Sequence, residues 1–120
     1  MLFNILTCMI LIADSGSTKC DWIAVDENGI LPIQKIRTKG LNPAILTAEE
    51  LQEIISHSEA LTTLKNKITK IYFHGAGCGT EIPKVLLKTV LERLFTKVKV
   101  SVKEILCVYL CGNYQEDEVG

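Results

Sequence analysis

A polar turn between two apolar stretches, close to the start of the chain, constrains the fold more than any other feature of the sequence. Residues 9–13 (MILIA) are entirely apolar, residues 14–19 (DSGSTK) are small or polar, and residues 20–26 (CDWIAVD) are again largely apolar. Short apolar runs bounded by turn-forming residues are typical of buried strands. We therefore predict a strand, a tight polar turn and a second strand.

A third strand is expected in the same sheet. Residues 26–29 (DENG) contain Asn-Gly, which readily adopts the positive φ angles of a tight hairpin turn. Residues 30–38 then carry Ile33 and Ile36 among polar neighbours, which suits a half-exposed strand. The three strands together predict an antiparallel meander.

Two helices are expected after the meander. Thr47 and Glu50 form a capping box, which predicts a helix start. The polar stretch 56–63 (SHSEALTT) could divide this helix in two. Thr80 is predicted to cap the second helix. The apolar residues at helical spacing are Leu51, Ile54, Ile55, Leu61, Leu64 and Ile68 in the first helix, and Leu86, Leu87, Val90, Leu91 and Leu94 in the second.

The order of the elements predicts the fold class. Residues 70–74 form a fourth strand before the second helix, and residues 98–102 form a fifth after it. A doubly wound parallel sheet would alternate strand and helix from the beginning. A three-stranded antiparallel meander followed by two strand-helix crossovers instead predicts an α/β fold of the ribonuclease H-like type, the half-domain of actin-like ATPases.

Length and charge exclude several functions. A chain of 120 residues suffices for one domain, and 13 basic against 14 acidic residues give a net charge of -1 without a basic cluster. Binding to nucleic acid is therefore not expected.

Residues 1–13 lack the basic start and cleavage site of a signal peptide and are too short to span a membrane. We expect residues 1–8 to be an extension, with Met9 as an alternative start.

The five cysteines predict a reducing environment. They form no CxxC pair and no histidine stands at metal-ligand spacing, so we expect free thiols in a cytoplasmic protein. A zinc site at Cys107 and Cys111 is disfavoured because tetrahedral zinc needs a second pair of ligands.

The turn after the first strand has the composition of a phosphate-binding site. Small residues leave backbone N–H groups unshielded, hydroxyl groups add donors, and Lys19 adds a positive charge. Asp14 lies where its carboxylate could orient water bound to Mg²⁺. An ordinary hairpin is the alternative, since Asp, Ser and Gly form turns in any protein. The predicted phosphate-binding residues are Ser15, Gly16, Ser17, Thr18 and Lys19.

Residues 10–29 (ILIADSGSTKCDWIAVDENG) resemble the opening of the BadF/BadG/BcrA/BcrD-type ATPases, which include N-acetylglucosamine kinases within the actin, sugar-kinase and heat-shock-chaperone superfamily. The sequences GLNP at 40–43 and HGAGCG at 74–79 support the resemblance, which covers residues 9–100. It implies ATP and Mg²⁺ as cofactors and the same roles for Asp14 and the turn. The family more often has threonine where Cys20 stands.

The resemblance also implies residues that contact a sugar. Asn42 corresponds to a position that hydrogen-bonds substrate hydroxyls, and Gly75 and Gly77 to a loop lining the sugar side of the cleft. A plain turn asparagine and a flexible connection are the alternatives. The glycines match neither a Walker A motif nor a dinucleotide fingerprint, because Thr80 occupies a required glycine position.

The resemblance weakens after the fifth strand. In the family, an aspartate just after this strand is the catalytic base, and a second half-domain completes the nucleotide site. Here that position falls near Val102, with Glu104 the nearest acid. We therefore leave the catalytic residue unassigned and expect an N-terminal half, with the ATPase domain at 9–102 and a divergent or truncated tail at 103–120.

These features predict the N-terminal half of an ATP-dependent sugar kinase whose complete form acts on N-acetylglucosamine. The resemblance leaves a homodimer open for the complete protein. One alternative is an ATPase that activates an iron-sulfur dehydratase, whose relatives hold a cluster between cysteines at a dimer interface. The other is a non-catalytic nucleotide-binding or scaffold domain.

Overall fold

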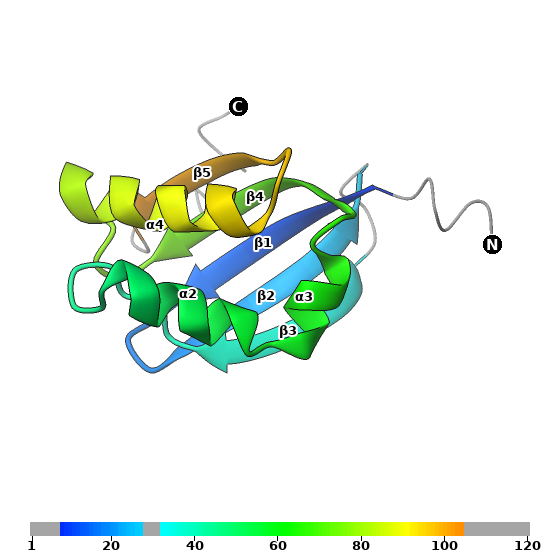
Figure 1. The fold of residues 1–120 in the computed structure, drawn as a ribbon. Coiled ribbons are helices and arrows are strands. Elements are labelled where there is room, and N and C mark those ends of the chain that lie inside the picture. Colours follow the sequence, from blue (N-terminus) through cyan, green and yellow to red (C-terminus); the bar gives the residue numbers. More distant parts are fainter. Residues whose placement is uncertain (1–7, 28–31, 105–120) are drawn as a thin grey trace, which may run out of the picture.

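A single five-stranded sheet forms the framework of the protein (Figure 1). The computed structural model describes residues 8–27 and 32–104, so the predicted Asn-Gly turn and most of the predicted extension and tail lie outside the described residues. The five predicted strands are all confirmed, with ends that differ by at most two residues. They are β1 (Met9–Ser15), β2 (Lys19–Asp26), β3 (Pro32–Lys39), β4 (Ile68–Gly75) and β5 (Lys99–Glu104).

The strand order is β3-β2-β1-β4-β5. Strand β2 pairs antiparallel with both β1 and β3, whereas β4 pairs parallel with both β1 and β5. The meander and the two crossovers predicted from the element order are therefore confirmed. Because β1 and β4 are parallel neighbours, the segments that follow them emerge at the same edge of the sheet.

The first predicted helix is two helices, α2 (Ala48–Ser56) and α3 (Glu59–Leu64). The capping box of Thr47 and Glu50 is present, with both reciprocal hydrogen bonds. The helix ends in the polar stretch because the hydroxyl of Ser58 accepts a hydrogen bond from the amide of Leu61 and starts a new helix. Ile68 is not part of the helical stripe as predicted; it is the first residue of β4 and is buried there.

The second predicted helix is α4 (Glu81–Leu94). Leu87, Val90 and Leu91 are buried, which confirms the predicted stripe. Thr80 stands at the N-cap as predicted, but its side chain makes no capping hydrogen bond. No helix in the described part of the chain is long and apolar enough to cross a membrane.

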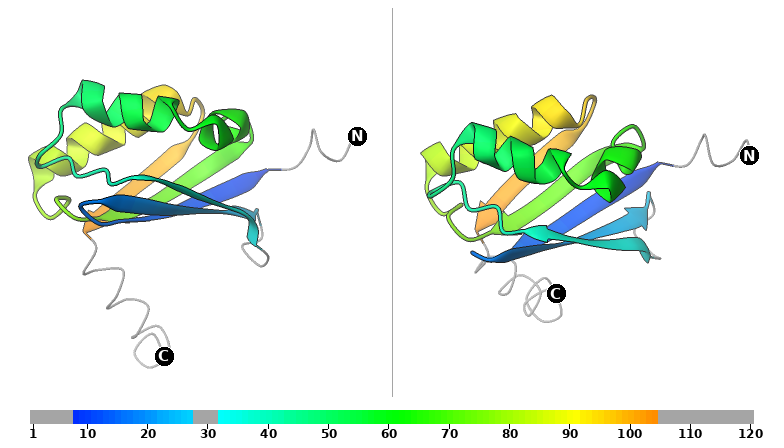
Figure 2. Two further views of the ribbon diagram at one scale, coloured as in Figure 1. Left: turned by 90° about the horizontal axis from the view of Figure 1, so that it is seen from below. Right: turned by 60° about the horizontal axis from the view of Figure 1, so that its bottom comes forward.

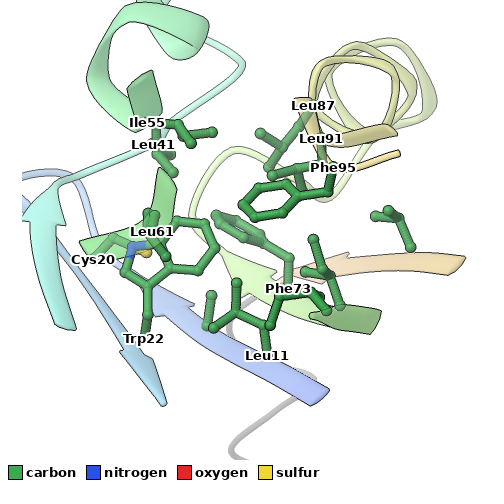
Figure 3. Close-up of a cluster of buried hydrophobic side chains, with 14 of the residues drawn as sticks. Leu11, Cys20, Trp22, Leu41, Ile55, Leu61, Phe73, Leu87, Leu91 and Phe95 are labelled. Carbon is green, nitrogen blue, oxygen red and sulfur yellow. The ribbon is translucent and has the colours of Figure 1, made fainter. Parts of the chain in front are cut away.

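In the described part of the chain, the helices α2, α3 and α4 lie on one face of the sheet (Figure 2). Side chains alternate between the two faces of a strand, so every second residue points toward these helices. Trp22 and Phe73 are both fully buried on this side, with their rings edge to face at a centroid distance of 5.8 Å (Figure 3). The prediction that Trp22 is a core residue is confirmed.

Strand β3 is less buried than the predicted pattern suggested. Ile36 points toward the helices and is 9% exposed, whereas Ile33 is 48% exposed. Residues three apart on a strand lie on opposite faces, so both isoleucines cannot enter one core.

Candidate functional site

Three loops meet where β1 and β4 end. Ser15, the last residue of β1, pairs with Gly75, the last residue of β4, and Gly75 in turn pairs with Glu104 of β5. The turn 16–18, the loop 40–46 and the loop 76–80 all begin at this edge. The predicted phosphate, metal and sugar residues therefore lie at one end of the sheet, although they are up to 63 positions apart in the sequence, from Asp14 to Gly77.

The turn after β1 leaves part of its backbone free. The amide of Gly16 donates to the carbonyl of Lys19 at 2.9 Å, and the carbonyl of Thr18 accepts from the amide of Gly40 at 3.0 Å. Among the described residues, the amides of Ser17 and Thr18 donate to no backbone carbonyl. Both residues are exposed, so two adjacent N–H groups at this turn are available to an anion.

Ser15 connects the three loops. Its hydroxyl accepts a hydrogen bond from the amide of Leu41 at 2.8 Å and donates to the carbonyl of Gly16 at 3.1 Å. Its own carbonyl accepts from the amide of Ala76 at 2.9 Å. Ser15 is fully buried, so its hydroxyl is engaged inside the fold. We therefore assign the outward-facing polar groups of the turn to Ser17, Thr18 and Lys19.

Gly40 is a site residue that the sequence reasoning did not single out. A Cβ atom at this position would lie 2.5 Å from the carbonyl oxygen of Ser17 and 2.6 Å from that of Gly16. Only glycine allows β3 to pass this close to the turn. The available signal in the sequence is its place at the start of GLNP, the stretch that supports the family resemblance.

Asp14 and Lys19 lie on the face of the sheet opposite the helices. Asp14 is exposed and pairs across the sheet with Asp21 on one side and His74 on the other. The side chain of Arg37 donates to Asp21 at 2.7 Å, and this hydrogen bond holds the pKa of Asp21 below its usual value. Asp14 therefore points to solvent rather than into the core, as a water-mediated metal role requires.

Asn42 and the glycines of the β4 loop are in contact. Asn42 is 8% exposed, and its side-chain oxygen accepts a hydrogen bond from the amide of Ala44 at 2.9 Å. Gly77 has φ 81° and lies so close to Asn42 that a Cβ atom would overlap its side-chain oxygen. Gly75 packs against Phe73 and Ser15. The structure thus brings the predicted sugar residues together, with the amide nitrogen of Asn42 left without a partner among the described residues.

Among the described residues, Cys20 and Cys78 are buried cysteines that remain thiols. Burial raises the pKa of Cys20 to about 12 and that of Cys78 to about 11. A thiolate is the form that attacks or binds metal, so neither group is poised for such chemistry at neutral pH. No group of three or more His, Cys, Asp or Glu side chains in residues 8–27 and 32–104 is arranged to hold a metal ion.

His74 is half-buried beside the site. Its Nδ1 atom is buried with no hydrogen-bond partner in the described structure. Burial lowers the pKa of His74, and so does the neighbouring charge of Lys103 on β5, whereas Asp14 on β1 acts in the opposite direction. The neutral imidazole is therefore the form that the folded protein favours.

This preference predicts a pH dependence of stability. Because the pKa of His74 is lower in the folded protein than in the unfolded chain, the unfolded chain binds more protons below about pH 6.5. The contribution of His74 to stability is therefore complete above about pH 6.5 and is lost as the pH falls through its folded pKa. We expect the free energy of unfolding, measured with urea, to change less between pH 5.5 and pH 7.5 in His74→Gln than in the wild type. An equal difference in both proteins would contradict this account.

Comparison with known proteins agrees with this architecture. No protein-family model matches the sequence, and no curated protein matches it. Among solved structures, the protein is similar to a candidate N-acetylglucosamine kinase from Porphyromonas gingivalis, with 30% sequence identity, a TM-score of 0.76 and 87% of this chain covered. The fold is a sugar-kinase half-domain of the actin-like ATPase type. This chain spans 38% of the length of that neighbour.

Proposed function

We propose that the protein is the N-terminal half of an ATP-dependent sugar kinase of the BadF/BadG/BcrA/BcrD type, and that in the complete enzyme it binds the γ-phosphate and the sugar. The observation that carries this proposal is the junction at Ser15, a buried residue whose hydroxyl bonds to the polar turn and the Asn42 loop and whose backbone carbonyl bonds to the Gly77 loop. The similarity to a candidate N-acetylglucosamine kinase supports a sugar as the substrate.

Each part of the junction has a chemical role in this proposal. The amides of Ser17 and Thr18, with the charge of Lys19, bind the terminal phosphate oxygens of ATP, and bound Mg²⁺ would neutralise charge on the phosphates. Asp14 orients water on the metal from the exposed face. The amide nitrogen of Asn42 donates to a sugar hydroxyl. Gly77 keeps the backbone of its loop close to that side chain.

Phosphoryl transfer also needs a carboxylate base, and none is assigned among the described residues. By the family resemblance, the position of the catalytic aspartate falls near Val102, which is apolar and 6% exposed. The carboxylate of Glu104 lies over Gly79, where an added Cβ atom would approach its Oε2 atom to 2.6 Å. These observations favour a second candidate function, nucleotide binding without transfer, for the chain as it stands. Mass-spectrometric assay with MgATP and N-acetylglucosamine separates the two, because only a kinase forms the phosphorylated sugar.

The metal role of Asp14 can be tested by calorimetric titration with ATP. Asp14→Asn is expected to weaken binding of MgATP by about tenfold or more, the usual effect of removing an outer-shell metal partner. In EDTA the same substitution should not weaken binding of free ATP, because one negative charge near the phosphates has been removed. Asp21→Asn is the matched control: it makes the same change one strand away on the same face and should leave MgATP binding within a factor of two or so.

Two results would count against the proposal. Equal MgATP affinity of the wild type and Asp14→Asn would contradict the proposed role of Asp14 in holding the metal ion. If the wild type shows no detectable binding of MgATP at millimolar concentration, the proposed nucleotide site is contradicted.

A further inference from the structure

One face of the sheet is uncovered in the described part of the protein. The helices α2, α3 and α4 all pack on the other face (Figure 2). By the alternation of the strands, the uncovered face carries the side chains that point away from the core. The residues of this open face are Ile10, Ile12, Asp14, Lys19, Asp21, Ile23, Val25, Ile33, Lys35, Arg37, Lys39, Lys70, Tyr72, His74, Lys99, Ser101 and Lys103.

The centre of the open face is apolar. Ile12 pairs with Ile23 on β2 and with Tyr72 on β4, so the three side chains form a row across the middle strands. Ile12 is 38% exposed and Tyr72 is 39% exposed, although both belong to central strands of the sheet. Adjacent exposed apolar side chains at the centre of a sheet indicate a surface that another segment covers.

One edge of the open face is basic. Lys70 and Lys99 are direct neighbours on the parallel strands β4 and β5, at the end where both strands begin. Both side chains are exposed, and Ile10 is the next neighbour in the row. Like charges side by side on a sheet repel each other, so this edge favours an acidic partner.

The chain contains a segment with the matching pattern. Residues 105–111 (ILCVYLC) are seven consecutive apolar residues that follow directly on β5, and Glu116, Asp117 and Glu118 form an acidic cluster behind them. β5 ends at the edge opposite Lys70 and Lys99, about 17 Å away at 3.3 Å per strand residue. Residues 105–115 span about 16 Å even as a helix, the most compact common conformation, so the acidic cluster can reach the two lysines.

We propose that residues 105–120 cover the open face of the sheet, with the apolar residues on the row of Ile12, Ile23 and Tyr72 and the acidic cluster at Lys70 and Lys99. Two independent features support this placement. A segment that runs from the end of β5 toward Lys70 and Lys99 brings its apolar residues over the apolar row first and its acidic cluster to the two lysines afterwards. The proposal concerns how the domain is closed and does not depend on the nucleotide site.

The native cysteines of the segment allow a test in the full-length chain. Cys107 and Cys111 should react with a maleimide at least about tenfold more slowly in the native protein than in urea, because covering the sheet buries them. Peptide mass spectrometry distinguishes them from the other cysteines, and Cys20 and Cys78 provide a reference for a packed core. Native labelling of Cys107 and Cys111 at the rate measured in urea would overturn the proposal.

Charge reversal tests where the segment lies. The double variant Lys70→Glu/Lys99→Glu should accelerate labelling of Cys107 and Cys111 several-fold, whereas the matched variant Lys65→Glu/Lys88→Glu, on the helical side, should not. Equal rates in the two variants would mean that the segment packs elsewhere. Protection that grows with protein concentration, together with a dimer in light scattering, would mean that a second copy covers the face. Either result rejects the proposal.

Discussion

Replacing Trp22 by alanine is expected to lower the free energy of unfolding by about 3–5 kcal/mol, which is much of the stability of a domain of this size. Trp22 has no exposed surface and packs edge to face on Phe73. Its Nε1 atom donates to the hydroxyl of Thr38 at 3.0 Å. One side chain thus joins β2 to β3 by a hydrogen bond and to β4 by packing, so the cavity left by alanine would loosen three strands together.

The measurement is urea unfolding followed by far-UV circular dichroism, because Trp22 is the only tryptophan and its fluorescence disappears in the variant. Trp22→Phe is the control. It keeps an aromatic ring against Phe73 but loses the bond to Thr38, so a smaller loss is expected, about 1–3 kcal/mol. An unfolding midpoint of Trp22→Ala equal to that of the wild type would show that the core reorganises around the gap.

Replacing Gly77 by alanine is expected to lower the free energy of unfolding by about 2–5 kcal/mol and to disrupt the site. The φ angle of 81° is unfavourable for any residue with a Cβ atom by about 1–2 kcal/mol. The added methyl group would also overlap the side-chain oxygen of Asn42, which is buried and bonded to the amide of Ala44. Overpacking of a filled interior adds about 1–3 kcal/mol. Asn42 must move, so we expect sugar binding by the complete enzyme to be lost as well.

Gly79→Ala is the matched control two residues along the same loop. Its Cβ atom would meet only the end of the Glu104 side chain, which can move away, and Gly79 does not have a positive φ angle. We expect a change within about 0.5 kcal/mol. If thermal unfolding monitored by circular dichroism gives equal losses for the two variants, the contact between Gly77 and Asn42 is not the cause.

Most of the fold could be predicted because its determinants are local. The capping box at Thr47, the stripe of α4 and the apolar run of β1 each depend on residues a few positions apart, and all three are present in the structure. Predictions failed where a local pattern was ambiguous. Ile68 continued the helical spacing by chance, and its place in β4 follows from pairing with β1, which no local pattern reports.

The site could be predicted only as separate pieces. The polar turn and the two loops were recognised from their composition and from a family resemblance. The buried hydroxyl of Ser15, the close approach of Gly40 to the turn and the contact between Gly77 and Asn42 are long-range packing relations. A free hydroxyl and an engaged one look identical in a sequence, which is why Ser15 was expected to face a phosphate.

By itself, the sequence determined the order of strands and helices and the chemical character of the turn at 14–19, because periodicity, capping and turn composition act over a few residues. Only the tertiary structure decided which groups of that turn remain available and which residues stand beside them. The physical reason is that parallel pairing of β1 with β4 brings Ser15 next to Gly75, which is 60 positions away in the chain. At this junction some polar groups, such as the hydroxyl of Ser15, are engaged in hydrogen bonds inside the fold, whereas others remain exposed to solvent.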